Sequence, residues 1–235
     1  MMVRIGNFFF RYRNGLFPLM FVLLFLHSPK LLPNQSVAVV LGFAVALAGQ
    51  LLRAITIGLA YIIRGGKKRQ VYADNLVQDG MFTHCRNPLY VGNLLVLLGL
   101  GLIANSILFL LIGMPFFIFA YIAIVAAEEN FLRQKFGAEF DAYCRQVGRF
   151  IPNFAGFGKT WQGMEFKWRR LVVKEYGSTY AWLAAACALL LKDRWMQAHT
   201  FSDPCMRALL GALVLVTATY AAARYLKKSR ILEAD

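Results

Sequence analysis

The sequence is poor in charged side chains, and acidic residues are the scarcer kind. Only 16% of its 235 residues are charged, with 12 Asp and Glu against 26 Lys and Arg. Ordinary soluble domains carry roughly 25% charged residues. Because 59% of the residues are hydrophobic and occur in long uninterrupted runs, the composition excludes an ordinary soluble domain and predicts an integral membrane protein.

Cysteine is also scarce, with four residues in the whole chain: Cys85, Cys144, Cys187 and Cys205. Their spacing matches no common metal-ligand pattern. The first two fall in segments that we predict to face the cytoplasm, where thiols stay reduced. The sequence therefore predicts neither a disulfide nor a metal site.

Six apolar segments are candidate membrane spans. A helix needs about 20 residues to cross a hydrocarbon core of roughly 30 Å. The candidates are residues 16–32, 37–63, 90–104, 107–127, 180–191 and 205–225. The third and fourth form a helical hairpin that turns at Asn105-Ser106. The predicted fold is thus an all-α, multi-pass transmembrane helical bundle of about six spans.

The net charge of +14 could suggest a nucleic-acid partner, but its distribution indicates a membrane topology instead. If six spans alternate, 21 of the 26 Lys and Arg fall in segments on one side. That bias follows the positive-inside rule. We therefore expect no nucleic acid, a multi-pass integral membrane location, and both termini in the cytoplasm.

Three parts can be distinguished along the chain. Residues 1–40 hold the first span, residues 41–152 form a core, and residues 153–235 comprise an interfacial linker, up to about residue 178, and an appended transmembrane hairpin. Within the core, residues 64–79 are a basic connector. Residues 128–146 alternate charged and aromatic side chains at helical spacing, which predicts an amphipathic cytoplasmic arm.

Two polar clusters bracket the central hairpin. The first is GMFTHCRNPLYVG at 80–92, and the second runs from Glu128-Glu129 to Pro152. Asn87-Pro88 could simply start a helix, and Arg86 could anchor the chain to lipid phosphates. Two adjacent carboxylates at a basic membrane surface are costly without a cation. They indicate a positively charged ligand, such as an ammonium or a sulfonium.

The motifs resemble a known enzyme family. The Gly-x-Phe-x-x-x-Arg-Asn-Pro-x-Tyr-x-Gly stretch at 80–92, Glu-Glu at 128–129, Phe-Gly at 136–137, Tyr143, and Arg-Phe-Ile-Pro at 149–152 are similar in order and separation to motifs of the isoprenylcysteine carboxyl methyltransferase and phospholipid methyltransferase superfamily. The resemblance covers roughly residues 41–152. It implies an integral membrane methyltransferase that uses S-adenosylmethionine.

The resemblance also implies a cofactor pocket facing the cytoplasm, formed by the loop before the hairpin and the amphipathic arm. The expected cofactor contacts are Leu76, Val77, Phe82, Arg86, Asn87, Pro88, Tyr90 and Glu128. Asn87 stands where the family more often has His. Ile124 stands where the eukaryotic carboxyl methyltransferases place a substrate-contacting Arg, which weakens a prenylcysteine-carboxylate assignment.

Methyl transfer mainly requires the nucleophile to be positioned against the methyl carbon with water excluded. A carboxylate nucleophile needs no base, whereas an amine must lose a proton, for which Glu129, His84 or Tyr143 could serve. Arg149 could bind an anionic group of the substrate. Arg53, inside the second span, either snorkels or pairs within the bundle, which we favour slightly, or lines the substrate cleft.

The sequence thus predicts a methyltransferase acting on a lipidic or lipid-soluble acceptor, either the carboxylate of an isoprenylcysteine-like group or a phospholipid amine. Two alternatives stay open. Membrane sterol reductases resemble the same architecture and use a nicotinamide cofactor. A non-catalytic membrane protein would use the stretch at 80–92, which we call the motif loop, only to cap a helix.

Overall fold

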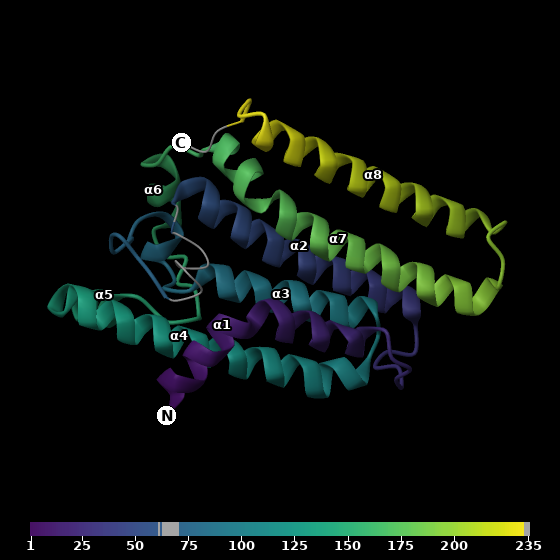
Figure 1. Cartoon of the computed structure of the whole chain (residues 1–235), viewed down its shortest axis with the longest axis horizontal. Helices are drawn as coiled ribbons and strands as arrows, with labels where there is room; N and C mark the ends of the chain where they lie inside the picture. The colour runs from purple at the N-terminus through teal and green to yellow at the C-terminus, as the bar shows by residue number, and fades with distance from the viewer. Residues whose placement is uncertain (61, 63–70, 233–235) are drawn as a thin grey trace.

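The computed structural model describes residues 1–60, 62 and 71–232. These residues form an all-α bundle in which long helices lie side by side (Figure 1). The long helices are α1 (Met2–Phe21), α2 (Gln35–Leu59), α3 (Pro88–Ile103), α4 (Met114–Phe136), α7 (Trp168–Ala198) and α8 (Pro204–Lys228). The shorter elements are α5 (Ala138–Gln146), α6 (Phe157–Gln162), the 3₁₀ turns Val22–Leu24 and Gly80–Thr83, and the π-helical segment Phe109–Gly113.

The bundle has the lengths and hydropathy of a membrane protein. Within the described residues, three helical segments are long and apolar enough to cross a bilayer, namely Gln35–Leu59, Phe109–Phe136 and Pro204–Lys228, and α3 is a shorter apolar helix. Successive long helices alternate in direction, so the start of α1 and the end of α8 lie at the same end of the bundle as α5 and α6 (Figure 1). We call this end the polar end. Of the predicted basic connector, residues 64–70 lie outside the described residues.

The first helix differs from the prediction for residues 16–32. It spans Met2–Phe21 instead, and a 3₁₀ turn at Val22–Leu24 follows it. Proline has no N–H to continue a helix, and Pro29 and Pro33 break the later part of the apolar run. Asn34 then caps α2 by accepting from the N–H groups of Ser36 and Val37 at 2.9 and 3.2 Å.

The predicted hairpin turn is confirmed. Asn105 follows α3 with a left-handed φ of 51°, a conformation that Asn adopts more readily than most residues. Its side chain accepts from the N–H of Leu32 and donates to the carbonyl of Leu32, both at 2.8 Å. The turn between α3 and α4 is therefore tied to the segment that links α1 to α2.

Two boundaries after the hairpin were predicted wrongly. The amphipathic arm is helical but breaks at Gly137, whose φ is 52°, so that α5 leaves α4 at a bend. The linker predicted to reach residue 178 ends at Trp168, where α7 begins and continues for 31 residues. Arg170, in the first turn of α7, donates from its guanidinium to the carbonyls of Ile57 and Gly58 at 2.8 and 2.7 Å and so caps the end of α2.

Glycine allows α2 and α3 to approach closely. A Cβ on Gly99 would lie 2.5 Å from the carbonyl oxygen of Gly42, and a Cβ on Gly49 would lie 2.6 Å from that of Gly92. Small residues at helix interfaces let backbones meet, and this is a principal source of packing energy inside membranes. The α2–α3 pair is therefore the rigid element that carries the motif loop.

We expect Gly99→Leu to separate α2 from α3 and to lower the thermal unfolding midpoint in detergent, because the added side chain collides with the backbone of α2. Overpacking of this kind costs roughly 1–3 kcal/mol or more. Gly211→Leu is the matched control, since a Cβ there meets nothing within 4 Å. Equal midpoints for the two variants would contradict the packing described here.

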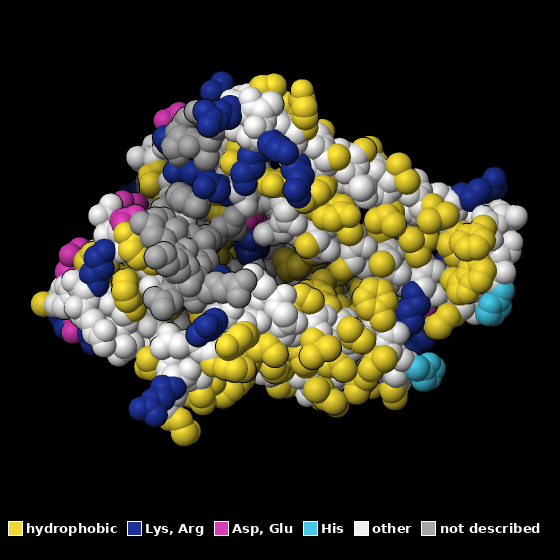
Figure 2. All heavy atoms as spheres, viewed as in Figure 1, with side chains coloured by type: hydrophobic (Ala, Val, Ile, Leu, Met, Phe, Trp, Pro, Cys, Tyr) yellow, Lys and Arg dark blue, Asp and Glu magenta, His cyan; other side chains and the backbone are white. Residues whose placement is uncertain are grey.

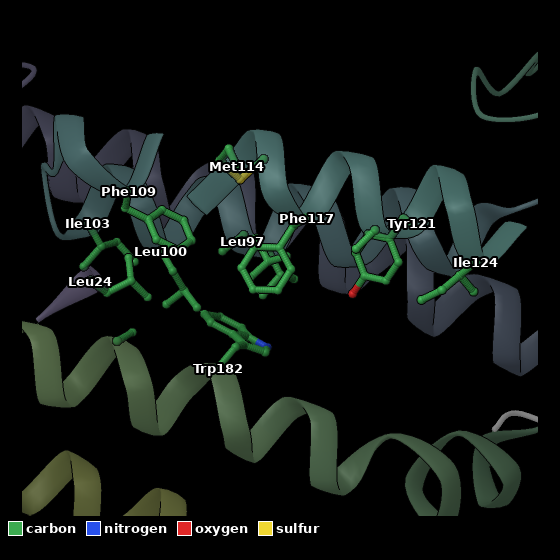
Figure 3. Close-up of a cluster of buried hydrophobic side chains, with 14 of the residues drawn as sticks. Leu24, Leu97, Leu100, Ile103, Phe109, Met114, Phe117, Tyr121, Ile124 and Trp182 are labelled. Carbon is green, nitrogen blue, oxygen red and sulfur yellow. The ribbon is translucent and has the colours of Figure 1, made fainter. Parts of the chain in front are cut away.

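A cluster of buried side chains lies between α3, α4 and α7. Figure 3 shows Phe117 and Tyr121 of α4 facing Trp182 of α7, with Leu97 and Leu100 beside them. Phe117 and Leu100 are fully buried. The appended helix α7 is thus packed into the same hydrophobic core as the hairpin.

Candidate functional site

The two polar clusters of the sequence meet at the polar end of the bundle. The Arg86 N–H donates to the carbonyl of Gly148 at 2.9 Å, and the Asn153 N–H donates to that of His84 at the same distance. Asn87 precedes α3, but its side chain makes no cap; it donates to the carbonyl of Arg149 at 3.0 Å. Pro88 begins α3 as predicted. The motif loop is therefore fastened to the segment that follows α5.

A cavity of about 290 Å³ lies between these segments, and we call it the loop cavity. Its lining comes from α1, from α4, from α5 and from the part of the chain that precedes α3. The lining residues are Phe10, Ile62, Val71, Tyr72, Ala73, Asp74, Asn75, Leu76, Val77, Phe82, Arg86, Asn87, Glu128, Glu129, Leu132, Phe140 and Tyr143. Six of the eight predicted cofactor contacts are among them. The other two, Pro88 and Tyr90, line a neighbouring cavity.

The neighbouring cavity, which we call the central cavity, has a volume of about 670 Å³. It is lined by Arg13, Asn14, Phe17, Pro18, Phe21, Arg53, Ile62, Phe82, Arg86, Asn87, Pro88, Leu89, Tyr90, Asn93, Tyr121, Glu128 and Ser178. Phe82, Arg86, Asn87 and Glu128 border both cavities. A group held in one cavity can therefore meet a group held in the other along this shared wall.

Glu128 is joined to Tyr90 across the α3–α4 hairpin. The Tyr90 hydroxyl donates to Oε1 of Glu128 at 2.8 Å. A carboxylate this deep in an apolar helix is costly to leave unpaired. Within the described part of the chain, the tyrosine bonds one carboxylate oxygen.

Glu129 is held by two arginines. Arg149 grips it with Nε at 2.9 Å from Oε1 and with a second bond from Nη2 to Oε2, while Arg86 Nη2 lies 3.3 Å from Oε1. The carboxylate raises the pKa of Arg149 above its ordinary value, chiefly through the hydrogen bond. Arg149 lines neither cavity. The structure therefore does not place it where an anionic substrate would bind, contrary to the prediction.

We expect Glu129→Ala to loosen the segment after α5 from α4, because it leaves two guanidinium groups without their carboxylate. Breaking a fully buried ion pair from one side costs roughly 3–5 kcal/mol, and we expect a smaller loss here because the Arg149 side chain is 40% exposed. Limited proteolysis at residues 146–156 should become faster. Asp141→Ala is the control, because its pair with Arg133 is exposed and such pairs contribute about 0–1 kcal/mol. Equal cleavage rates for the two variants would contradict this role of Glu129.

Two further candidate bases are occupied by structural contacts. The Tyr143 hydroxyl donates to the carbonyl of Phe82 at 2.6 Å, and burial raises its pKa above the ordinary 10.0. His84 is buried outside both cavities, with Nδ1 2.7 Å from the carbonyl of Asn153 and Nε2 2.9 Å from Oγ1 of Thr160. With Glu129 held in ion pairs, the prediction that these three residues could accept a proton is not supported by their geometry.

Several lining residues were missed by sequence reasoning. Phe10 and Arg13 come from the first helix, which the prediction placed too late in the chain. Residues 71–75 belong to the connector and carry no periodic signal; Lys135 of α4 holds them in place by donating to the carbonyl of Asp74 at 3.0 Å. The aromatic and acidic side chains within residues 72–74 were the one sequence signal that could have indicated a binding site there.

Arg53 pairs within the bundle, as the preferred interpretation has it, and its partner is Glu175 of α7. Nη2 and Nε of Arg53 lie 2.8 and 2.9 Å from the two carboxylate oxygens. Nη2 also donates to Ser178 at 3.1 Å, and Nη1 bonds to Asn93. Arg53 lines the central cavity too, and its second interpretation, that it lines a substrate cleft, stays a prediction.

Comparison with known proteins finds one family that matches part of this chain. The phospholipid methyltransferase family matches residues 36–139. The cobalt-zinc-cadmium resistance protein CzcN of Cupriavidus metallidurans is 34% identical over 115 residues, which cover 49% of this chain and 48% of that protein. The nickel-cobalt-cadmium resistance protein NccN of Alcaligenes xylosoxydans xylosoxydans is 33% identical over 117 residues, or 50% and 49%.

This chain therefore spans about half the length of the curated relatives that it matches. No solved structure matches it significantly. Among residues 1–60, 62 and 71–232, no three His, Cys, Asp or Glu side chains are grouped so as to hold a metal ion, and the four cysteines are free.

The family match begins at the start of α2 and ends at the start of α5. It contains the motif loop, the α3–α4 hairpin and Glu128-Glu129, which are the parts that form the loop cavity and most of its shared wall. The resemblance drawn from the motifs is thereby confirmed: residues 36–139 match the phospholipid methyltransferase family, which is consistent with the superfamily of integral membrane methyltransferases.

Proposed function

We propose that this protein is an S-adenosylmethionine-dependent methyltransferase that methylates a lipidic or lipid-soluble acceptor. The observation that carries the proposal is the shared wall of the two cavities. The loop cavity opens among polar loops, whereas the central cavity lies between membrane helices. A water-soluble cofactor and an acceptor from the bilayer could meet at Glu128 and Asn87.

The residues of the loop cavity fit the charges of S-adenosylmethionine. When bound, this cofactor supplies a methyl group on a positively charged sulfur. Glu128 offers a carboxylate oxygen to its cationic groups, and the ring of Phe82 provides an apolar wall. The Nε of Arg86 is buried and has no hydrogen-bond partner in the described part of the chain. A buried unsatisfied donor is costly, so this atom is suited to the cofactor carboxylate.

Glu129, Tyr143 and Arg149 take structural roles in this proposal. They fix Arg86, Phe82 and the segment after α5, and so they shape the cavity without touching the acceptor. Leu76 and Val77 line the loop cavity and would offer their backbone groups to the cofactor, and Pro88 begins α3. We further propose that the polar end is cytoplasmic, because the basic residues concentrate there, so that both termini face the cytoplasm.

The first test is calorimetric titration of the detergent-purified protein with S-adenosylhomocysteine and, separately, with reduced nicotinamide adenine dinucleotide phosphate. We expect saturable binding of the first and none of the second. The reverse result would select the membrane reductase alternative. Binding of neither, in protein with a normal unfolding midpoint, would select the non-catalytic alternative.

A further inference from the structure

A third cavity continues from the central cavity into the membrane core, and we call it the apolar cavity. It has a volume of about 440 Å³ and shares Phe17, Pro18, Arg53, Asn93 and Tyr121 with the central cavity. Beyond these, its walls are mostly hydrocarbon and aromatic. They include Leu97 and Leu100 of α3, Phe117 of α4, and Ala181, Trp182 and Ala185 of α7.

The two connected cavities are open to the bilayer between α1 and α7. Pro18 of α1 and Ala181 of α7 are exposed although both line the apolar cavity. Figure 2 shows a hollow on this face between the positions of α1 and α7 in Figure 1, with apolar side chains at its border and charged side chains visible inside it. A chain from the surrounding lipid can therefore enter sideways.

The charges in the central cavity favour an anion. Arg13, Arg53 and Arg86 line it, against the single carboxylate of Glu128. Arg53 is paired with Glu175 and Arg86 with Glu129, and Glu128 accepts from the uncharged Tyr90 hydroxyl. Arg13 makes a contact with the ring of Phe10 at 4.3 Å and has no ion pair with any other described residue. It is placed to hold an anionic headgroup.

We infer that the acceptor site is built by α1 and α7, two helices outside the family match, and that it binds a single-chain membrane amphiphile with an anionic headgroup. Arg13 holds the headgroup in the central cavity, beside the wall shared with the loop cavity. The hydrocarbon chain lies in the apolar cavity against Trp182. The identification of this amphiphile as the methyl acceptor rests on the proposed function.

Quenching of Trp182 fluorescence tests the site directly. A variant with Trp161, Trp168 and Trp195 replaced by Phe retains Trp182 as its single tryptophan. The probes are 9,10-dibromostearate, the corresponding neutral alcohol and the corresponding amine. We expect saturable quenching that is strongest for the carboxylate. Stronger quenching by the amine would overturn the assignment of an anionic headgroup. A matched protein that retains only the exposed Trp195 is the control, because it reports quenching by probe dissolved in the detergent.

Two substitutions separate the headgroup from the chain. Arg13→Gln should weaken binding of the carboxylate probe by about tenfold or more, since it removes a charge-assisted bond, and should leave binding of the alcohol probe unchanged. Arg11→Gln is the control, because Arg11 lies on the exposed side of α1. Ala185→Phe should abolish saturable quenching by every probe because it fills the apolar cavity, whereas Ala184→Phe, which lines none of the three cavities, should not.

Titration of the same variants with S-adenosylhomocysteine keeps the two proposals apart. Normal cofactor binding together with unchanged amphiphile binding in Arg13→Gln and Ala185→Phe would overturn this inference and leave the proposed function standing. Amphiphile binding that responds as expected, in a protein that does not bind S-adenosylhomocysteine, would overturn the proposed function while leaving the amphiphile site in place.

Discussion

Replacing Glu128 by alanine should lower the affinity for S-adenosylhomocysteine by about tenfold to a hundredfold, because a hydrogen bond to a charged group contributes roughly 1.5–3 kcal/mol. Glu128 is the carboxylate that borders both the loop and the central cavity. Calorimetric titration of the detergent-purified variant measures the effect directly.

Two companion variants make this result interpretable. Tyr90→Phe removes the hydroxyl that bonds Glu128 at 2.8 Å and should weaken binding less, since the carboxylate itself remains. Glu139→Ala changes an exposed carboxylate on α5 that lines neither of these cavities and should bind normally. Unchanged affinity in both Glu128→Ala and Tyr90→Phe would show that the cofactor does not bind in the loop cavity.

Replacing Arg53 by leucine should destabilise the bundle by roughly 3–5 kcal/mol, because it removes the guanidinium that bonds both oxygens of the buried Glu175 carboxylate. The side chains of Arg53 and Glu175 are 7% and 3% exposed, so water cannot replace the lost partner. The loss should appear as a lower thermal unfolding midpoint in detergent. Glu175→Leu should do the same from the other side.

The double variant Arg53→Met with Glu175→Leu should recover most of the lost stability, since an apolar pair of similar volume often replaces a buried ion pair without cost. Arg133→Leu, which breaks an exposed pair on α4 and α5, should change the midpoint little. A double variant destabilised by the sum of the two single losses would mean that Arg53 and Glu175 contribute independently, and that the pair does not join α2 to α7.

Much of the fold could be predicted from local pattern. The long apolar runs indicated helices in a membrane because lipid requires backbone groups to bond within each segment. Asn105-Ser106 marked the hairpin turn, and the spaced motifs marked a methyltransferase core. Helix ends were less predictable. The first helix began well before its predicted start, and α7 began earlier than its hydropathy indicated, with Arg170 in its first turn bonded to the end of α2.

The roles of individual side chains were decided by tertiary structure. Arg53 and Glu175 are 122 residues apart in sequence, so no local pattern could pair them. Arg149 looked like an anion-binding residue until the structure placed Glu129 in its guanidinium fork.

The sequence by itself determined that the chain is a helical membrane protein with a methyltransferase motif loop, because apolar periodicity and motif spacing are local properties of the chain. Only the packing of α1 and α7 against the α3–α4 hairpin decided which charged groups neutralise one another and that Arg13 lines the central cavity without an ion pair among the described residues. That outcome depends on distances between helices, which sequence separation does not encode.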